Sequence, residues 1–189
     1  MIDSMKYLFV IYTDIEYKYH LDNFKSQEFY RQICNDSNIE VIEWGTDFHT
    51  DYKNLPIKTQ EMMKWCSENK EYDYLIKCDD TIFMREDLKD EFVYENIFVD
   101  KQDYYGIKKR IFSYEEFYIE WYKNKGLGEL DKSLSDIAKG YFYDGKCFVV
   151  SKDFSHFIGG QRGIAKIFSK RLKAMEDIMV SFIYREMYI

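Results

Sequence analysis

Three short apolar runs, and the segments between them, constrain the fold of this 189-residue chain most. The runs cover residues 6–13, 39–44 and 72–78, and their β-branched and aromatic residues are typical of buried strands. Between them, residues 19–34 and 59–69 space their apolar side chains as one face of a helix does. This order of strand, helix, strand, helix and strand predicts an α/β fold with mostly parallel strands and flanking helices.

The second half of the chain is less regular. Residues 104–108 and 146–151 are expected to form strands, and residues 163–187 are expected to be mostly helical. No repeat, low-complexity tract or break in composition interrupts the sequence. We therefore expect a single domain over residues 1–189, with a nucleotide-binding half at residues 1–100 and a loop-rich half after it.

Charge and composition exclude several classes of protein. The chain has 27 Lys and Arg against 34 Asp and Glu, a net charge of −7, which disfavours duplex nucleic acid and anionic membranes as partners. It has neither a signal peptide nor an apolar stretch of membrane-spanning length, so we expect a soluble cytoplasmic protein with no membrane insertion. It could also be one domain of a longer polypeptide. Four widely spaced cysteines predict four buried free thiols.

Two adjacent aspartates follow the third apolar run. In open α/β sheets, ligands bind beyond the carboxyl ends of the strands, where Asp79 and Asp80 would meet the residues that follow the first run. Paired carboxylates can hold a hard divalent cation, which in turn can bridge nucleotide phosphates. The alternative is an ordinary turn, in which aspartate is common. A phosphatase-type nucleophile site fits poorly, because Thr81 stands where its second aspartate would be.

Motifs elsewhere in the chain narrow the function. Residues 47–59 (DFHTDYKNLPIKT) resemble the pattern D-F-x-D-x-Y-x-N-L-T-x-K-T, with looser spacing at the start. Residues 74–83 (YLIKCDDTIF) resemble (apolar)-L-K-x-D-x-D-(apolar)-F, except that Thr81 stands at the last aspartate. The further matching segments are Trp65, residues 104–106 with Arg110, residues 141–151 and residues 176–180. In this order and spacing, the segments resemble the motifs of the β-1,3-galactosyltransferase and Fringe-like glycosyltransferases.

The resemblance implies a GT-A (Rossmann-like) fold with a mixed, mostly parallel sheet. It implies an inverting transfer of a sugar from a UDP-sugar to a hydroxyl of a glycan or glycoprotein acceptor. Mn²⁺, or Mg²⁺, would be held by Asp79 and Asp80, and residues 101–189 would form the acceptor-binding half. The chain would be a compact soluble relative of the kind found in bacteria and large DNA viruses.

The resemblance also assigns roles to single residues. Asp177 is the expected catalytic base, with Glu176 as the second candidate. The alternative for Asp177 is an acidic residue that favours the first turn of the last helix. A lysine at position 58 could reach phosphate or the metal-site carboxylates, although a lysine at a helix start is more often solvated.

The nucleotide is expected to contact the end of the first strand. There the ring of Tyr12 could stack on uracil, and the polar groups of Thr13 and Asp14 could bind the base or the ribose. The alternative is an ordinary turn between a strand and a helix.

Two departures from the family's pattern keep other functions open. Thr81 replaces the second aspartate of the metal motif, and no glycine follows the last acidic motif. A non-catalytic module that binds nucleotide sugars is therefore the first alternative. A metal-dependent phosphotransferase that uses the acidic pair is the second.

Overall fold

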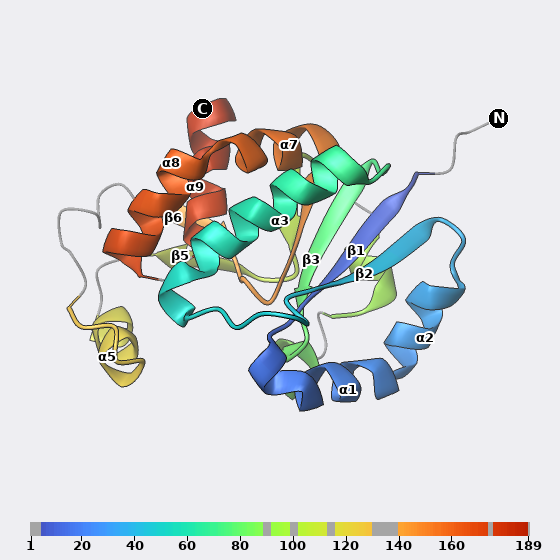
Figure 1. Ribbon diagram of the computed structural model, residues 1–189, viewed down its shortest axis with the longest axis horizontal. Coiled ribbons are helices and arrows are strands. Elements are labelled where there is room, and N and C mark those ends of the chain that lie inside the picture. Colours follow the sequence, from blue (N-terminus) through green and yellow to red (C-terminus); the bar gives the residue numbers. More distant parts are fainter. Residues whose placement is uncertain are drawn as a thin grey trace.

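A five-stranded mixed sheet runs through the centre of the protein (Figure 1). The computed structural model describes residues 5–88, 92–98, 102–112, 116–129, 140–173 and 176–188. In sheet order, the strands are β2 (Ile39–Trp44), β1 (Tyr7–Tyr12), β3 (Tyr74–Asp79), β7 (Cys147–Ser151) and β4 (Tyr104–Gly106). A separate hairpin joins β5 (Lys109–Phe112) to β6 (Gly140–Tyr143). The chain is thus a single α/β domain with helices around a mixed sheet.

The direction of the strands places the first three carboxyl ends side by side. β1 pairs in parallel with β2 and with β3, so that Tyr12 lies opposite Trp44 on one side and Asp79 on the other. β7 is antiparallel to both β3 and β4, so it alone of the five runs in the opposite direction. The loops after β1, β2 and β3 therefore meet at one edge of the sheet, as parallel strands require.

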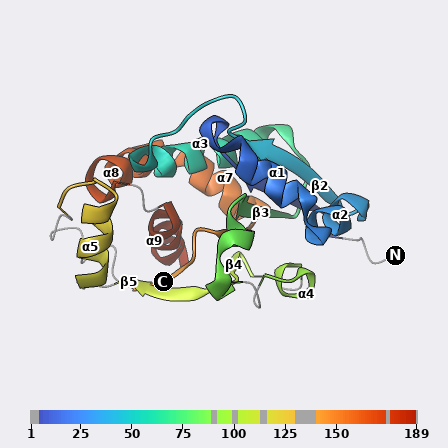
Figure 2. The same ribbon diagram turned by 90° about the horizontal axis from the view of Figure 1, so that it is seen from below.

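Helices cover both faces of the sheet (Figures 1 and 2). One face carries α3 (Leu55–Asn69), α7 (Lys152–Gly160), α8 (Arg162–Ile167) with the π-helical turn η5 (Phe168–Leu172), and α9 (Glu176–Tyr188). The other face carries α1 (Lys18–Ser26), α2 (Glu28–Asn35) and α4 (Tyr94–Ile97). Helix α5 (Glu116–Asn124) lies at one end of the molecule, beside α8.

The side chains of β1 point alternately to the two faces of the sheet and divide the core into two layers. Leu8, Val10 and Tyr12 pack on the side of α3, α7 and α9, whereas Phe9 and Ile11 pack on the side of α1 and α2. Successive side chains of a strand point to opposite faces, so a run that is apolar throughout must be covered on both faces. The continuous apolar run seen in the sequence is thus explained by its central position.

The predicted elements of the front half are largely confirmed, with one correction. Residues 19–34 were expected to form one helix, but Gln27 has extended backbone angles (φ −76°, ψ 149°) and separates α1 from α2. Its N–H group donates to the carbonyl oxygen of Phe24 and ends the first helix. Both helices still bury apolar residues in the same layer, so the apolar spacing continues across the break and conceals it.

The back half departs further from the prediction. The apolar spacing did not predict α7 or the hairpin strands β5 and β6. The helical stretch expected over residues 163–187 consists of α8, η5 and α9, and residues 174–175 lie outside the described ranges. Three of the free cysteines are buried as expected, but Cys34 is exposed at the end of α2. Among the described residues, no helix has both the length and the apolar character needed to cross a membrane.

Helices α3 and α7 pack so closely that one glycine is required between them. A Cβ atom at Gly159 would lie 2.7 Å from the Cα of Lys64, in the backbone of α3. The carbonyl oxygen of Gly159 also accepts a hydrogen bond from the side-chain amide of Gln60. The backbone of α3 cannot yield as a flexible side chain would, so the two helices would have to separate.

We expect Gly159→Ala to lower the free energy of unfolding by about 1–3 kcal/mol, the usual cost of overpacking. Gly160→Ala is the matched control, because a Cβ there meets nothing within 4 Å and alanine favours the helix. Urea denaturation followed by circular dichroism measures both. Equal stability of the two variants would contradict this close packing.

Candidate functional site

A buried lysine lies at the carboxyl edge of the sheet and joins several segments. Lys77 is fully buried in β3, and its Nζ donates to Oδ1 of Asp79 (2.5 Å) and to the carbonyl oxygen of Gly145 (2.5 Å). Oε1 of Glu176, at the start of α9, lies 3.4 Å from the same nitrogen. A lysine inside an apolar strand needs a charged partner, and the carboxylates of Asp79 and Glu176 provide it. The ammonium group thus connects β3, the turn before β7 and the last helix.

The charges around Lys77 decide its protonation. Burial alone lowers the pKa of an ammonium group, but the carboxylates of Asp79 and Glu176 outweigh burial and raise the pKa of Lys77. The lysine is therefore charged at neutral pH. A buried charge is tolerated only when it is paired and hydrogen-bonded, and here both conditions hold.

Both carboxylate oxygens of Asp79 are held by lysines. Oδ1 accepts from Lys77, and Oδ2 accepts from Nζ of Lys146 at 2.8 Å. Lys146 also donates to Oγ1 of Thr81 at 2.8 Å. Burial acts to raise the pKa of Asp79, but the two lysines outweigh it and lower that pKa. Asp79 is thus a carboxylate that stays ionised.

Asp80 faces different partners from Asp79. Its Oδ2 accepts a hydrogen bond from Oγ1 of Thr13 at 2.6 Å, and the side chain is only 5% exposed. Burial, with the nearby charge of Asp79, raises the pKa of Asp80. The two adjacent aspartates therefore do not present their oxygens to one common point.

The carboxylates at this edge of the sheet do not meet the needs of a divalent cation. Such an ion takes several oxygen ligands that converge on it, but the oxygens of Asp79 are occupied by two ammonium groups. The side chains as placed do not fit Mn²⁺ or Mg²⁺, because Lys146 lies where the cation would have to bind Asp79. We therefore derive no chemical step through a metal ion.

Asp177 lies beside the same cluster and is held by backbone groups. Its Oδ2 accepts from the N–H of Gly145 (3.0 Å), and its Oδ1 accepts from the N–H of Ile178 (2.8 Å). Burial raises the pKa of Asp177 well above its ordinary value, and the neighbouring charge of Glu176 adds to this effect. A carboxyl group with a raised pKa suits proton transfer near neutral pH. The pKa of Glu176 is also raised by burial.

Tyr12 and Lys58 occupy positions that differ from the sequence-based expectation. Lys58 is only 4% exposed, so the alternative of a solvated lysine is wrong, and its Nζ donates to the carbonyl oxygen of Thr13. The ring of Tyr12 is 5% exposed, with Nζ of Lys58 and of Lys77 at 4.3 Å and 4.5 Å from its centroid. Little of this ring remains for stacking on a base, contrary to our expectation. It instead packs against two ammonium groups.

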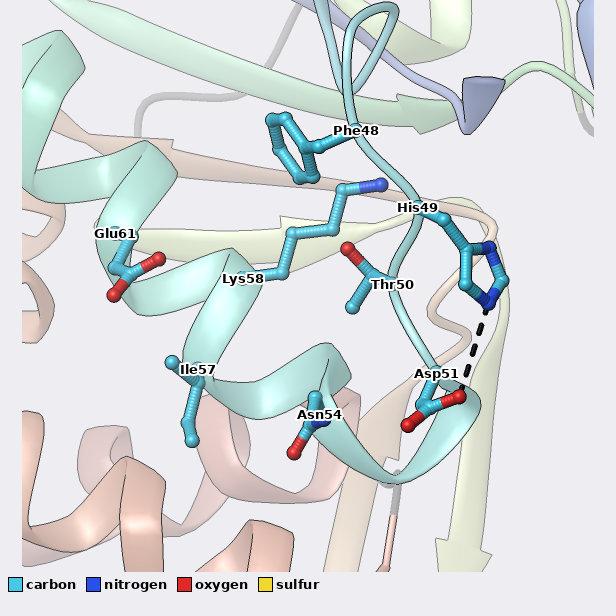
Figure 3. A pocket seen from close by; sticks show the side chains of 8 residues that line it. All are labelled: Phe48, His49, Thr50, Asp51, Asn54, Ile57, Lys58 and Glu61. Carbon is cyan, nitrogen blue, oxygen red and sulfur yellow. Dashed lines mark ion pairs between the residues drawn. The ribbon is translucent and has the colours of Figure 1, made fainter. Parts of the chain in front are cut away.

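A pocket of about 440 Å³ opens beside Lys58 (Figure 3). Its lining residues are Phe48, His49, Thr50, Asp51, Asn54, Ile57, Lys58 and Glu61. They come from the loop after β2 and from the start of α3, and Figure 3 shows Lys58 extending toward Phe48 from the opposite wall. The ring of Phe48 is 38% exposed and lies 5.3 Å from Nζ of Lys58. Phe48 therefore offers an aromatic face in this pocket.

Asp14 connects the end of β1 with this loop. Its carboxylate accepts from the backbone N–H of Thr50 (2.8 Å) and contacts Nδ1 of His49 (3.0 Å). The hydrogen bond to Asp14 raises the pKa of His49. Asp14, Glu16 and His49 are the one group of three potential metal ligands in the described ranges, with ligand atoms within 4.8 Å of one another. No pattern in the sequence indicated this contact, since His49 lies far from Asp14 along the chain.

The structure thus brings most predicted site residues to one edge of the sheet, in two neighbouring groups. Asp79 and Glu176 contact Lys77, and Asp177 is bonded to Gly145, whose carbonyl oxygen accepts from the same lysine. Thr13, Asp14 and Lys58 lie beside the pocket of Figure 3. Sequence reasoning missed Lys146, although its position in a tight turn after Gly145, before a strand, could have indicated a side chain at the sheet edge.

Comparisons with known proteins add no assignment. No protein-family model matches the sequence, and no curated protein matches it either.

We expect the carboxyl group of Asp177 to titrate at a pH well above 3.8, because it is buried beside Glu176. Between the unfolded and folded pKa values, the folded protein binds more protons, so the contribution of Asp177 to stability falls as pH rises through that window. A ¹³C NMR titration of side-chain carboxyl carbons measures this pKa, and Asp177→Asn identifies the signal. A midpoint at or below 3.8 would contradict the burial of this carboxyl group.

Proposed function

We propose that the protein is a glycosyltransferase with a GT-A fold, similar to the β-1,3-galactosyltransferase and Fringe-like family. It transfers a sugar from a UDP-sugar to a hydroxyl group of a glycan or glycoprotein acceptor, with inversion at the anomeric carbon. The protein acts as an enzyme on two substrates, a nucleotide-sugar donor and the acceptor.

The observation that carries this proposal is the meeting of two distant motifs around one ammonium group. Lys77 and Asp79 belong to the strand motif, and Glu176 belongs to the last acidic motif, 99 residues after Lys77. These are two of the motifs on which the resemblance rests. A sheet edge that joins them is what a transferase of this kind needs, because the groups that bind the leaving diphosphate and the base that activates the acceptor hydroxyl must be placed around one anomeric carbon.

The pocket of Figure 3 supports the nucleotide part of the proposal. Its volume of about 440 Å³ lies in the range of small-molecule sites. Phe48 provides a ring on which a base can stack, in place of the buried Tyr12. Asp14 and Thr50 provide polar groups at the loop, and Lys58 provides a positive charge between this pocket and the carboxylate cluster.

Two features of the carboxylate cluster support the transfer step. A diphosphate gains negative charge as the glycosidic bond breaks, and Lys146 and Lys58 place positive charge at this edge of the sheet.

Asp177 takes the proton of the acceptor hydroxyl during attack, and its raised pKa suits this role. Tyr52 and Trp121, with ring centroids 5.6 Å apart, form an aromatic pair nearby that can contact a sugar.

One observation favours a second candidate, a non-catalytic module that binds nucleotide sugars. Lys146 bonds both Asp79 and Thr81, the residue that replaces the second aspartate of the family's metal motif. A lysine in this position can neutralise a bound diphosphate without supplying the Lewis acidity of a metal ion. Binding without turnover would then be the function of the site.

We expect Lys146→Ala to increase the affinity for Mn²⁺ by about tenfold or more, because Asp79 loses its competing ammonium partner. Asp79→Ala in the same background should remove this gain. Isothermal titration calorimetry with Mn²⁺ alone, and then with UDP in Mn²⁺ or EDTA, measures both effects. If UDP binds as tightly without metal and without both Asp79 and Asp80, the metal site that the resemblance implies at these two residues is wrong.

We expect slow hydrolysis of a UDP-sugar by the protein, and a loss of about 10²–10⁴-fold in Asp177→Asn, the usual contribution of a general base. Asp153→Asn is the matched control, since Asp153 is an exposed aspartate in the first turn of α7. Chromatography of released UDP from a panel of UDP-sugars gives the rates. Tight binding of a UDP-sugar with no release of UDP would favour the module instead of the enzyme.

A further inference from the structure

A second pocket, of about 390 Å³, lies on the other side of the start of α3. Its lining residues are Lys53, Asn54, Ile57, Gly126, Leu127, Lys166, Ser169, Lys170 and Lys173. They come from the start of α3, the segment after α5, and the stretch formed by α8 and η5, which lie together in Figures 1 and 2. Asn54 and Ile57 also line the pocket of Figure 3, so the two pockets share a wall.

Four lysines converge on this pocket in a protein whose net charge is −7. Lys166 and Lys170 are four residues apart, and neither has an ion-pair or hydrogen-bond partner in the part of the chain that the structure describes. Lys53 forms an ion pair with the exposed Asp51, at 3.4 Å. Like charges at this spacing repel one another unless an anion lies between them. The charge of the pocket is therefore complementary to an anionic ligand.

Two further features belong to the lining of this second pocket. Ser169 is 5% exposed, and its hydroxyl group has no hydrogen-bond partner among the described residues, which costs free energy unless a ligand or a neighbouring group supplies one. Lys173 has left-handed backbone angles (φ 44°, ψ 59°), which are uncommon for a residue other than glycine. Its Nζ donates to the carbonyl oxygen of Leu127 and so joins the end of η5 to the segment after α5.

We propose that this pocket binds a phosphate group of a small phosphorylated ligand. A phosphate group has two negative charges at most and several acceptor oxygens, so it can accept from more than one lysine. The pocket is concave and of small-molecule size, which favours a compact ligand over a flat membrane surface. Because it adjoins the pocket of Figure 3, the ligand is assigned as the acceptor, and this assignment rests on the proposed function.

Binding of hexose 6-phosphate, inorganic phosphate and unphosphorylated hexose is measured by calorimetry on the complete chain. We expect the hexose phosphate to bind, the free hexose not to bind, and Lys166→Glu with Lys170→Glu to weaken binding by about 100-fold, or tenfold for each charge. Lys6→Glu with Lys18→Glu is the matched control, because both lysines are exposed and neither lines the pocket. Lys166→Gln with Lys170→Gln replaces the double reversal if that variant does not fold. Ser169→Ala should weaken binding without lowering the free energy of unfolding.

Equal affinity of the wild type and the lysine variants would overturn the phosphate site. Tighter binding to vesicles with anionic phospholipids than to the hexose phosphate would overturn the choice of a small ligand. A parallel loss of UDP affinity in the lysine variants would overturn the acceptor assignment, because the pocket would then hold the donor. Failure of the proposed function can be told apart from failure of the phosphate site. In that case hexose phosphate would still bind in a way that depends on the lysines, but no UDP-sugar would be consumed.

Discussion

The ammonium group of Lys77 is the interaction on which the rest of this site depends. It is fully buried and contacts Asp79 from its own strand, the carbonyl oxygen of Gly145 from the turn before β7, and Glu176 from the last helix. Removing a charge from water is expensive, so the group is stable only where all three partners are in place. The same contacts therefore fix the position of α9 against the sheet and bring Asp177 to its edge. The position of α9 and the geometry of the site are thus linked.

This single charge also separates the roles of the surrounding carboxylates. Asp79 accepts hydrogen bonds from two lysines and its pKa is lowered, so it stays ionised, whereas Asp177 accepts from backbone N–H groups, and burial together with the charge of Glu176 raises its pKa. Neighbouring acids whose pKa values are moved apart can serve different functions, one as a fixed charge and the other as a group that exchanges protons. The asymmetry follows from position relative to the lysines, because both side chains are of the same type.

Part of the fold and of the site could be predicted, and the residues show why. The apolar run of β1 predicted a strand covered on both faces, and the need of Lys77 for a carboxylate partner followed from its place in an apolar strand. The break at Gln27 could not be predicted, because the apolar spacing on its two sides continues without a glycine or proline. The burial of Lys58 and Tyr12 could not be predicted either, since it depends on how α3 packs over the end of β1.

The sequence by itself determined the α/β class, the order of the front elements and the position of Asp79 and Asp80 at the end of a strand. These are local properties, set by apolar spacing and by the residues at which strands stop. Only the tertiary structure decided which charges meet. It placed Lys146 against Asp79, joined His49 to Asp14, and gathered four lysines from two distant segments into one pocket. Such contacts link residues far apart in the chain, and electrostatic energies depend on distance and burial in space, which no local pattern records.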